Sequence, residues 1–276
     1  MHPRAKKHFG QNWLVDETVV AKIIDAAEIK RGETVLEVGP GTGVLTQALV
    51  NAGAHVIAVE ADKSLIAPLR EKFGDTIELI QGDVLSLDFD RTQAPAVAKA
   101  LAGEKAWGYH HKTPYKLVAN IPYNITSDLL RHFLTTELKP SRMVLMLQKE
   151  VADRILAAPP DMSLLSVVCQ LYAQCRRVVN VPAGAFRPIP KVDSAVVRLD
   201  LYDVPAIGEM DPEEVIALAK LGFSSPRKQL HGNLKGVHRK GSSAVKEALV
   251  ACGLPATARA EALTVENWIA LTHILG

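Results

Sequence analysis

The sequence predicts an α/β fold followed by a small helical domain. Between residues 34 and 148 of the 276-residue chain, short apolar runs typical of buried strands alternate with segments whose apolar residues recur at helical spacing. Strands and helices that alternate in this way form parallel sheets with right-handed crossovers. Beyond the proline-containing stretch 205–212, the remaining patterns are helical.

Each element follows from its local pattern. The first helix, at residues 16–27, has apolar residues at helical spacing, and Asp16 is suited to cap its N-terminus. Residues 164–172 form an apolar element, and the Ala-rich run 91–113 reads as a helix followed by an irregular connection. We expect strands at residues 34–38, 55–60, 76–81, 116–119, 143–148, 176–181 and 195–201, and further helices at residues 43–51, 63–73, 127–134, 150–157, 215–223, 244–252 and 265–275. A large α/β domain is therefore placed at residues 1–203 and a helical domain at residues 204–276.

The composition restricts the class of protein. Hydrophobic residues make up 48% of the chain, which is enough for a sizeable core. No apolar run follows the basic N-terminus, as a secretory signal requires, and none approaches the length of a membrane span. The cysteines, Cys169, Cys175 and Cys252, lack the close spacing of a zinc site or a disulfide framework. We therefore expect a soluble cytoplasmic protein without a bound metal.

The net charge of +2 hides an uneven distribution. Residues 215–246 contain several Lys and Arg residues but no Asp or Glu, and the first fifteen residues also carry only basic charges. These two segments can form one phosphate-binding face if they meet in space. Two separate solvated faces are the alternative. We favour the phosphate-binding face because the motifs below also indicate a polyanionic partner.

A glycine-rich turn follows the first expected strand. In EVGPGTG, residues 37–43, the turn opens a helix and lets a small ligand contact bare backbone. The dinucleotide fingerprint G-x-G-x-x-G requires glycine at position 44, where this chain has Val44, and no Gly-Lys-Ser/Thr of a phosphate-binding loop follows. The spacing is instead that of S-adenosylmethionine (SAM)-dependent methyltransferases, which makes Gly39 and Gly41 candidate cofactor contacts.

Two acidic residues end the next two expected strands. Glu60 lies where a carboxylate can accept hydrogen bonds from both hydroxyls of a ribose. Asp83 lies where the amino group of an adenine could donate to it. Either acid alone is more often a solvated loop residue. Together with the glycine turn, at the carboxyl ends of three successive parallel strands, they favour a ligand site.

The tetrapeptide NIPY, residues 120–123, follows another expected strand. The exocyclic amine of adenine is a weak nucleophile because its lone pair is delocalised into the ring. The carboxamide oxygen of Asn120 and the backbone carbonyl of Pro122 are suited to accept both amine hydrogens, while Tyr123 stacks on the base. For an isolated motif, an ordinary turn with Tyr123 in the core is the alternative. After a SAM-type turn, the motif predicts methylation of an amino group on a nucleobase.

From near its first residue to near its last, the chain resembles the KsgA-type (RsmA) rRNA adenine N6-dimethyltransferases. The matching segments are FGQNWL at residues 9–14, the turn at 37–43, Glu60, Gly82-Asp83, NIPY, QKEV at 148–151 with Arg154, and AFRPIPKVDSAV at 185–196. The resemblance implies a Rossmann-like, SAM-dependent enzyme of ribosome biogenesis. Its expected reaction is the dimethylation of two adjacent adenines in a hairpin loop of small-subunit (16S) rRNA.

The same resemblance implies roles for individual residues. Asn12 and Leu14 would close over the methionine end of SAM, and Asn120 would contact both cofactor and substrate. Phe186 would be a second stacking ring beside the target base, with a core position as the alternative. The basic tail, with Arg227 and Lys228, would bind the rRNA of the immature small ribosomal subunit, and nothing in the sequence suggests an obligate dimer.

The chain departs from the family pattern at four places. Trp13 replaces the usual Phe, and Ile121 replaces the usual Leu. Residues 161–166 lack the usual Tyr-Gly, and Pro226 replaces the first Arg of Phe-x-x-Arg-Arg-Lys, which removes one possible phosphate contact. Two alternatives stay open. One is a 23S rRNA adenine methyltransferase of the macrolide-resistance type, in which Ile is common at the clamp, and the other is a ribosome-assembly factor that retains the fold.

Overall fold

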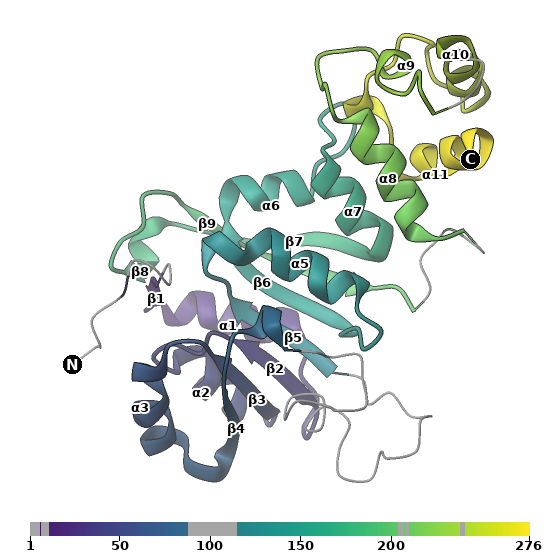
Figure 1. Ribbon diagram of the computed structural model, residues 1–276. Coiled ribbons are helices and arrows are strands. Elements are labelled where there is room, and N and C mark those ends of the chain that lie inside the picture. The colour runs from purple at the N-terminus through teal and green to yellow at the C-terminus, as the bar shows by residue number, and fades with distance from the viewer. Residues whose placement is uncertain (1–5, 7–10, 88–114, 204–206, 208–209, 238–240) are drawn as a thin grey trace, which may run out of the picture. The chain divides into compact units, whose positions relative to one another are not determined.

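The computed structural model describes residue 6 and residues 11–87, 115–203, 207, 210–237 and 241–276. The chain folds as two compact units, one of Met1–Ala152 with Arg176–Leu201 and the other of Asp153–Cys175 with Tyr202–Gly276 (Figure 1). The expected helix at 91–113 lies outside the described residues, as do Phe9 and Gly10 of the opening motif and Arg239 and Lys240 of the tail.

The first unit is built on a seven-stranded sheet in the order β4-β3-β2-β5-β6-β9-β7. Strands β4 to β6 of this order run parallel to one another, and β9 pairs antiparallel with β6. This arrangement confirms the predicted α/β fold class. The strands are β2 (Thr34–Val38), β3 (His55–Glu60), β4 (Ile77–Gln81), β5 (Tyr115–Asn120), β6 (Arg142–Gln148), β7 (Ala173–Val181) and β9 (Ser194–Leu201).

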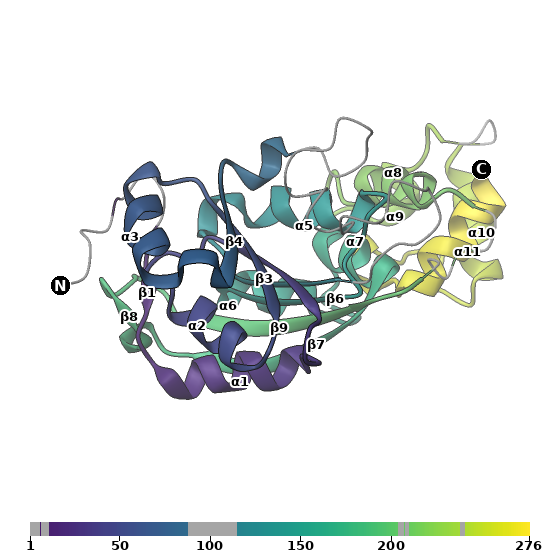
Figure 2. The ribbon, with the colours of Figure 1, turned by 90° about the horizontal axis from the view of Figure 1, so that it is seen from below.

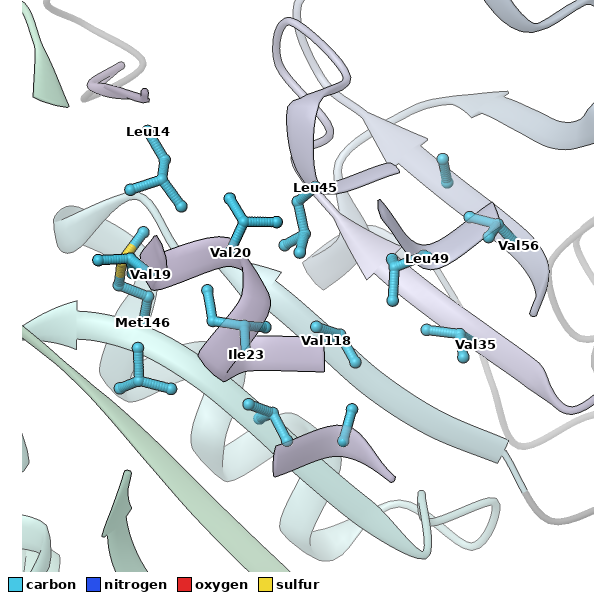
Figure 3. Close-up of a cluster of buried hydrophobic side chains, with 14 of the residues drawn as sticks. Leu14, Val19, Val20, Ile23, Val35, Leu45, Leu49, Val56, Val118 and Met146 are labelled. Atoms are coloured by element: carbon cyan, nitrogen blue, oxygen red, sulfur yellow. The ribbon is translucent and has the colours of Figure 1, made fainter. Parts of the chain in front are cut away.

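Helices cover both faces of this sheet. They are α1 (Glu17–Ala27), α2 (Val44–Asn51), α3 (Lys63–Phe73), α5 (Thr126–Thr135) and α6 (Lys149–Ile155). Asp16 caps α1 as predicted, since its side chain accepts hydrogen bonds from the backbone N–H groups of Thr18 and Val19. The apolar stripe of α1 and the buried side of α2 pack on one face of the sheet, where Val35 and Val118 point toward them (Figure 3). Helix α5 lies on the opposite face (Figure 2).

A second, two-stranded sheet joins distant parts of the chain. Strand β1 (Trp13–Leu14) pairs antiparallel with β8 (Phe186–Arg187), so Leu14 lies opposite Phe186. The backbone N–H of Val15 extends this pairing by donating to the carbonyl of Ala185 at 2.9 Å. Sequence patterns do not indicate these strands because two residues carry no periodicity.

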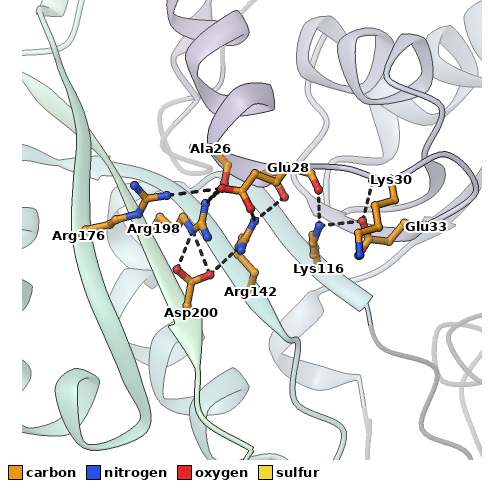
Figure 4. Close-up of polar contacts among 10 residues, drawn as sticks. Ala26, Glu28, Lys30, Glu33, Lys116, Arg142, Arg176, Arg198 and Asp200 are labelled. Carbon is orange, nitrogen blue, oxygen red and sulfur yellow. Dashed lines mark hydrogen bonds and ion pairs between the residues drawn. The ribbon is translucent and has the colours of Figure 1, made fainter.

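An ion-pair network lies at the amino end of the parallel strands, the end opposite the glycine turn (Figure 4). Its centre is Glu28, which ends α1 with a left-handed backbone (φ 49°) and accepts hydrogen bonds from Arg142 and Arg198. Asp200 accepts from the same two arginines. Nearby, Lys116 donates to Glu33 and to the carbonyl of Glu28, both at 2.7 Å. The hydrogen bonds from Arg198 and Arg142 lower the pKa of Glu28 to about 2.

The second unit is helical. It contains α7 (Leu164–Tyr172), α8 (Pro212–Gly222), α9 (Leu230–Asn233), α10 (Ser242–Ala251) and α11 (Val265–Leu275). Its core holds the fully buried ring of Trp268 against Gly222, where a Cβ atom would clash with that ring. The boundary predicted at residue 203 lies next to the change of unit at Tyr202, whereas Asp153–Cys175, expected in the first domain, belongs to the second unit because α7 packs against α8 and α11.

Short 3-10 helices complete the described elements: η2 (Gly74–Thr76), η3 (Val84–Ser86), η4 (Tyr123–Ile125), η5 (Ala183–Ala185) and η6 (Ala260–Ala262). None of the helices in the described part of the chain combines the length and the apolar character that crossing a bilayer requires.

Candidate active site

The main pocket of the first unit lies at the carboxyl ends of β2, β3 and β5, where a sheet of this topology is expected to bind ligands. Its volume is about 950 Å³, part of which is open to solvent. Nine of the residues predicted from the sequence line it together: Asn12, Leu14, Gly39, Gly41, Glu60, Asp83, Asn120, Pro122 and Tyr123. Phe186, Arg227 and Lys228 are not among the lining residues.

The glycine turn needs its glycines for two reasons. Gly39, Gly41 and Gly43 all have positive φ, at 69°, 60° and 74°. A Cβ atom on Gly41 would lie 2.7 Å from the ring of Trp13, and one on Gly43 would lie 2.5 Å from the ring of Phe73. At Gly39, in contrast, a Cβ atom would meet nothing within 4 Å. The turn is therefore packed tightly at Gly41 and Gly43 and open at Gly39, where a ligand can approach the backbone.

Glu60 is fixed at the end of β3 by the backbone around it. Its Oε2 accepts a hydrogen bond from the N–H of Gly41 at 3.2 Å, and its Oε1 accepts one from the N–H of Asp62 at 2.8 Å. Burial raises the pKa of Glu60, and these backbone hydrogen bonds oppose the rise. Asp83 lies exposed at the rim, where its Oδ1 accepts from the N–H of Leu85 at 3.0 Å. Two carboxyl groups thus line one pocket at separate points.

Glu37 is a pocket residue that sequence reasoning did not single out. Its side chain is only 1% exposed, yet it lines the pocket, and its Oε2 has no hydrogen-bond partner in the described structure. Burial raises the pKa of Glu37 to about 8. Its signal in the sequence was a carboxylate within an otherwise apolar strand. An unpartnered buried oxygen beside an open glycine turn fits a ligand that brings hydrogen-bond donors.

The end of β5 positions the predicted clamp. The side-chain amide of Asn120 donates to the backbone carbonyl of Asn12 at 3.2 Å, which leaves Oδ1 as its acceptor. The carbonyl of Pro122 accepts from the N–H of Ile125 at 3.1 Å and keeps a second lone pair. The hydroxyl groups of Tyr123 and Ser194 lie 2.8 Å apart. Burial raises the pKa of Tyr123, so its phenol stays protonated at neutral pH.

Phe186 is buried. Its side chain is 0% exposed and belongs to the hydrophobic core, and its backbone pairs with β1. This position agrees with the core alternative, and a contact between the ring and the target base stays a prediction. Of the two predicted rings, only Tyr123 lines the pocket.

Arg227 and Lys228 belong to the second unit, where both are exposed. They lie in the turn between α8 and α9, and the N–H of Lys228 donates to the carbonyl of Ser225 at 2.9 Å. The side-chain amide of Asn233 fixes this turn by donating to the carbonyls of Gly222 and Ser225. The departure at Pro226 thus falls within a turn that is held in place by its neighbours.

Comparison with known sequences gives consistent matches over the full chain. Residues 2–275 match the family model described as Ribosomal RNA adenine dimethylase. The chain is 42% identical to Ribosomal RNA small subunit methyltransferase A of Thermosynechococcus vestitus, with 99% of this chain and 97% of that protein covered. It is 39% identical to the protein of the same name from Dehalococcoides mccartyi, with 96% and 86% covered.

Solved structures share the fold. The structure of 23S rRNA methyltransferase ErmE superposes with a TM-score of 0.74 at 26% identity, covering 96% of this chain and 99% of the other. A dimethyladenosine transferase from Plasmodium falciparum gives a TM-score of 0.72 at 27% identity, with 94% and 95% covered. Both similarities extend over both units, and they confirm the predicted fold class.

Proposed function

The chain belongs to the ribosomal RNA adenine dimethylase family, and on this premise we propose that it dimethylates the N6 amino groups of two adjacent adenines in a hairpin loop of 16S rRNA. The observation that carries this proposal is the single pocket in which the glycine turn, Glu60 and Asp83 lie together with Asn120 and Tyr123. A site for a nucleoside-containing donor and a clamp for an aminopurine therefore share one space.

SAM, when bound, supplies a methyl group on a positively charged sulfur. Glu60 is suited to hold the ribose hydroxyls, and Asp83 is suited to accept from the adenine amino group of the cofactor. The open backbone at Gly39 and the unpartnered oxygen of Glu37 suit the polar end of the same ligand. Burial strengthens the interactions of Glu37 and Glu60, because little water competes at these two carboxyl groups.

The clamp holds the substrate amine. Oδ1 of Asn120 and the carbonyl of Pro122 accept its two hydrogens, which directs the nitrogen lone pair away from the ring. The ring of Tyr123, held by Ser194, stacks on the flipped base and fixes its plane. The role of these groups is to orient the amine, since a pocket that aligns two reactants removes much of the entropic barrier.

The small-subunit substrate is favoured over the 23S alternative by sequence identity. Relatives named for the small subunit are about 40% identical over nearly the whole chain, whereas 23S rRNA methyltransferase ErmE is 26% identical. We infer that the partner is the immature small subunit in the cytoplasm and that the enzyme acts as a monomer. The exposed basic residues of the second unit support an RNA partner, among them Lys220, Arg227, Lys228, Lys235 and Lys246.

The test is methyl transfer from labelled SAM to small subunits isolated from cells that lack the enzyme, with large subunits as the competing substrate. We expect two dimethyladenines in one hairpin loop of 16S rRNA and none in 23S rRNA. Asn120→Ala should abolish transfer and also weaken SAM binding, since Asn120 is expected to contact both cofactor and substrate. Label in 23S rRNA alone would support the resistance type. Normal ribosome assembly with Asn120→Ala would assign the essential role to binding.

A further inference from the structure

Residues 11–14, called the strap here, contact the ends of three neighbouring strands of the sheet. Nε2 of Gln11 donates to Oδ2 of Asp62 at 2.9 Å, just beyond β3. The carbonyl of the next residue, Asn12, accepts from the amide of Asn120 at the end of β5. The ring of Trp13 packs against Gly41, which lies beyond β2. All four strap residues line the pocket.

Asp62 accepts several hydrogen bonds at the point where Gln11 is held. The residue is only 2% exposed, and its carboxylate accepts hydrogen bonds from Gln11, from Nζ of Lys6 at 2.7 Å and from Oγ of Ser64 at 2.7 Å. Lys6 also donates its backbone N–H to Oε1 of Gln11 at 2.7 Å, which fixes the orientation of the Gln11 amide. The backbone N–H of Asp62 meanwhile holds Oε1 of Glu60. One residue therefore joins the strap to a proposed cofactor ligand.

We propose that Asp62 is a positioning residue that holds the strap at the pocket and thereby sets how long the cofactor remains bound. This inference rests on the proposed SAM-dependent function. Asp62 does not line the pocket, so it acts through Gln11 and not by contact with a ligand. A strap released at Gln11 leaves Trp13 and Asn12 less constrained, which opens a route for the cofactor to leave.

A purely structural role must be separated from this one, because Asp62 is also the N-cap of α3. Its side chain accepts from the N–H of Ser64 at 3.0 Å. Asn is an equally good N-cap, so Asp62→Asn retains this function. The same substitution places an amide NH₂ opposite the NH₂ of Gln11, so two donors face each other. The variant therefore breaks the strap contact at Gln11 and keeps the cap, while the ion pair with Lys6 becomes a hydrogen bond to a neutral amide.

The experiment exchanges the hydrogen-bond donor and acceptor between Gln11 and Asp62. Asp62→Asn and Gln11→Glu should each raise the Kd of SAM roughly tenfold, mainly through faster dissociation, which corresponds to one hydrogen bond to a charged group. The double variant Asp62→Asn/Gln11→Glu restores a donor opposite an acceptor at unchanged net charge. We expect its Kd to return to within about twofold of the wild-type value, the coupling that contacting residues show. Asp211→Asn, at the N-cap of α8, is the matched control and should leave the Kd unchanged.

Hydrogen exchange in the cofactor-free protein provides a second readout that does not depend on the function. The amides of Trp13, Leu14 and Val15 should exchange faster in Asp62→Asn and recover in the double variant. Equal Kd values and equal exchange in all variants would overturn the proposal, as would additive losses in the double variant. If the wild-type protein fails to bind SAM while exchange responds as described, the proposed function fails and the strap contact stands.

Discussion

The hydroxyl groups of Tyr123 and Ser194 lie within hydrogen-bond distance across 71 positions of the chain. This contact connects the clamp after β5 to the first residue of β9. It fixes the ring of Tyr123 at its outer end, while the backbone of NIPY fixes it at the inner end. The ring is therefore preorganised, and the site does not have to order it when the base arrives.

Substitution of Tyr123 should separate stacking from orientation. Tyr123→Ala should weaken base positioning by about 1–3 kcal/mol, the scale of a lost base–aromatic contact. Tyr123→Phe keeps the ring and loses the hydrogen bond, so we expect a smaller loss of kcat, and Ser194→Ala should match it. Single-turnover methyl transfer to small subunits measures these effects. Unchanged rates for Tyr123→Ala would make the ring a core residue.

Gly41→Ala should lower stability and SAM binding by more than backbone strain alone predicts. The new Cβ atom would lie 2.7 Å from the Trp13 ring and would displace the strap, so we expect lower stability and weaker SAM binding. Gly32→Ala is the matched control, since Gly32 also has positive φ (79°) but no atom within 4 Å of a Cβ. It should cost about 1 kcal/mol through strain only. Thermal unfolding and calorimetric titration with SAM measure both effects, and equal losses would contradict the clash.

Glu37 should make stability depend on pH. Burial raises its pKa from 4.5 to about 8, so the folded protein binds a proton that the unfolded chain has lost in this interval. Stability from this group is therefore present below the unfolded pKa and is lost as pH rises through the folded value. In denaturant titrations, Glu37→Gln should reduce the decline of the free energy of unfolding between about pH 5 and about pH 8.5. Parallel profiles for wild type and variant would show that burial does not shift this group.

Glu28 should make stability depend on pH in the opposite direction. Its pKa is lowered from 4.5 to about 2 by Arg198 and Arg142, so its contribution is present above the unfolded pKa and is lost as pH falls toward the folded value. Glu28→Gln should lower stability at neutral pH and reduce the loss in acid. Glu71→Gln, at an exposed position of α3, is the control and should change neither. Equal acid profiles for Glu28→Gln and wild type would exclude the network as a source of stability.

The turn of Arg227 and Lys228 should contribute to RNA affinity through charge. Arg227→Ala should lower the salt dependence of RNA binding, with the slope of log K against log salt reduced by about 1 for one lost phosphate contact. Lys22→Ala, exposed on α1 of the first unit, is the charge-matched control and should leave the slope unchanged. Filter binding with small-subunit rRNA at several salt concentrations measures the slope. Identical slopes for both variants would remove this turn from the RNA interface.

Most of the sheet could be predicted from sequence because its strands are short apolar runs bounded by turns. The expected bounds of β2, β3, α3 and α11 equal the observed ones, as do those of the apolar element at α7, and most other elements differ by one to three residues at their ends. Residues 153–175 could not be assigned to their unit, since that depends on packing between distant helices. The strands β1 and β8 were missed because a two-residue strand is defined only by its partner.

In the candidate site too, features set by local sequence could be predicted, whereas features set by distant partners could not. Motif residues such as Glu60 and Asn120 were found because the carboxyl ends of parallel strands bring them together. Asp62 was missed because its role depends on a hydrogen bond from Gln11, which lies in another part of the chain. The burial of Phe186 could not be predicted, since a motif gives the residue type and not the exposure of its side chain.

The position of β9 has a consequence for the order of folding. It is the last sheet strand to be synthesised, yet it lies between β6 and β7. The ladder from β4 to β6 can assemble from earlier segments, but a nascent chain that ends before Ser194 has no hydroxyl to meet Tyr123. Contacts of such long sequence separation form late, because loop closure must precede them. Catalytic competence should thus be acquired only after the interior of the sheet has been closed.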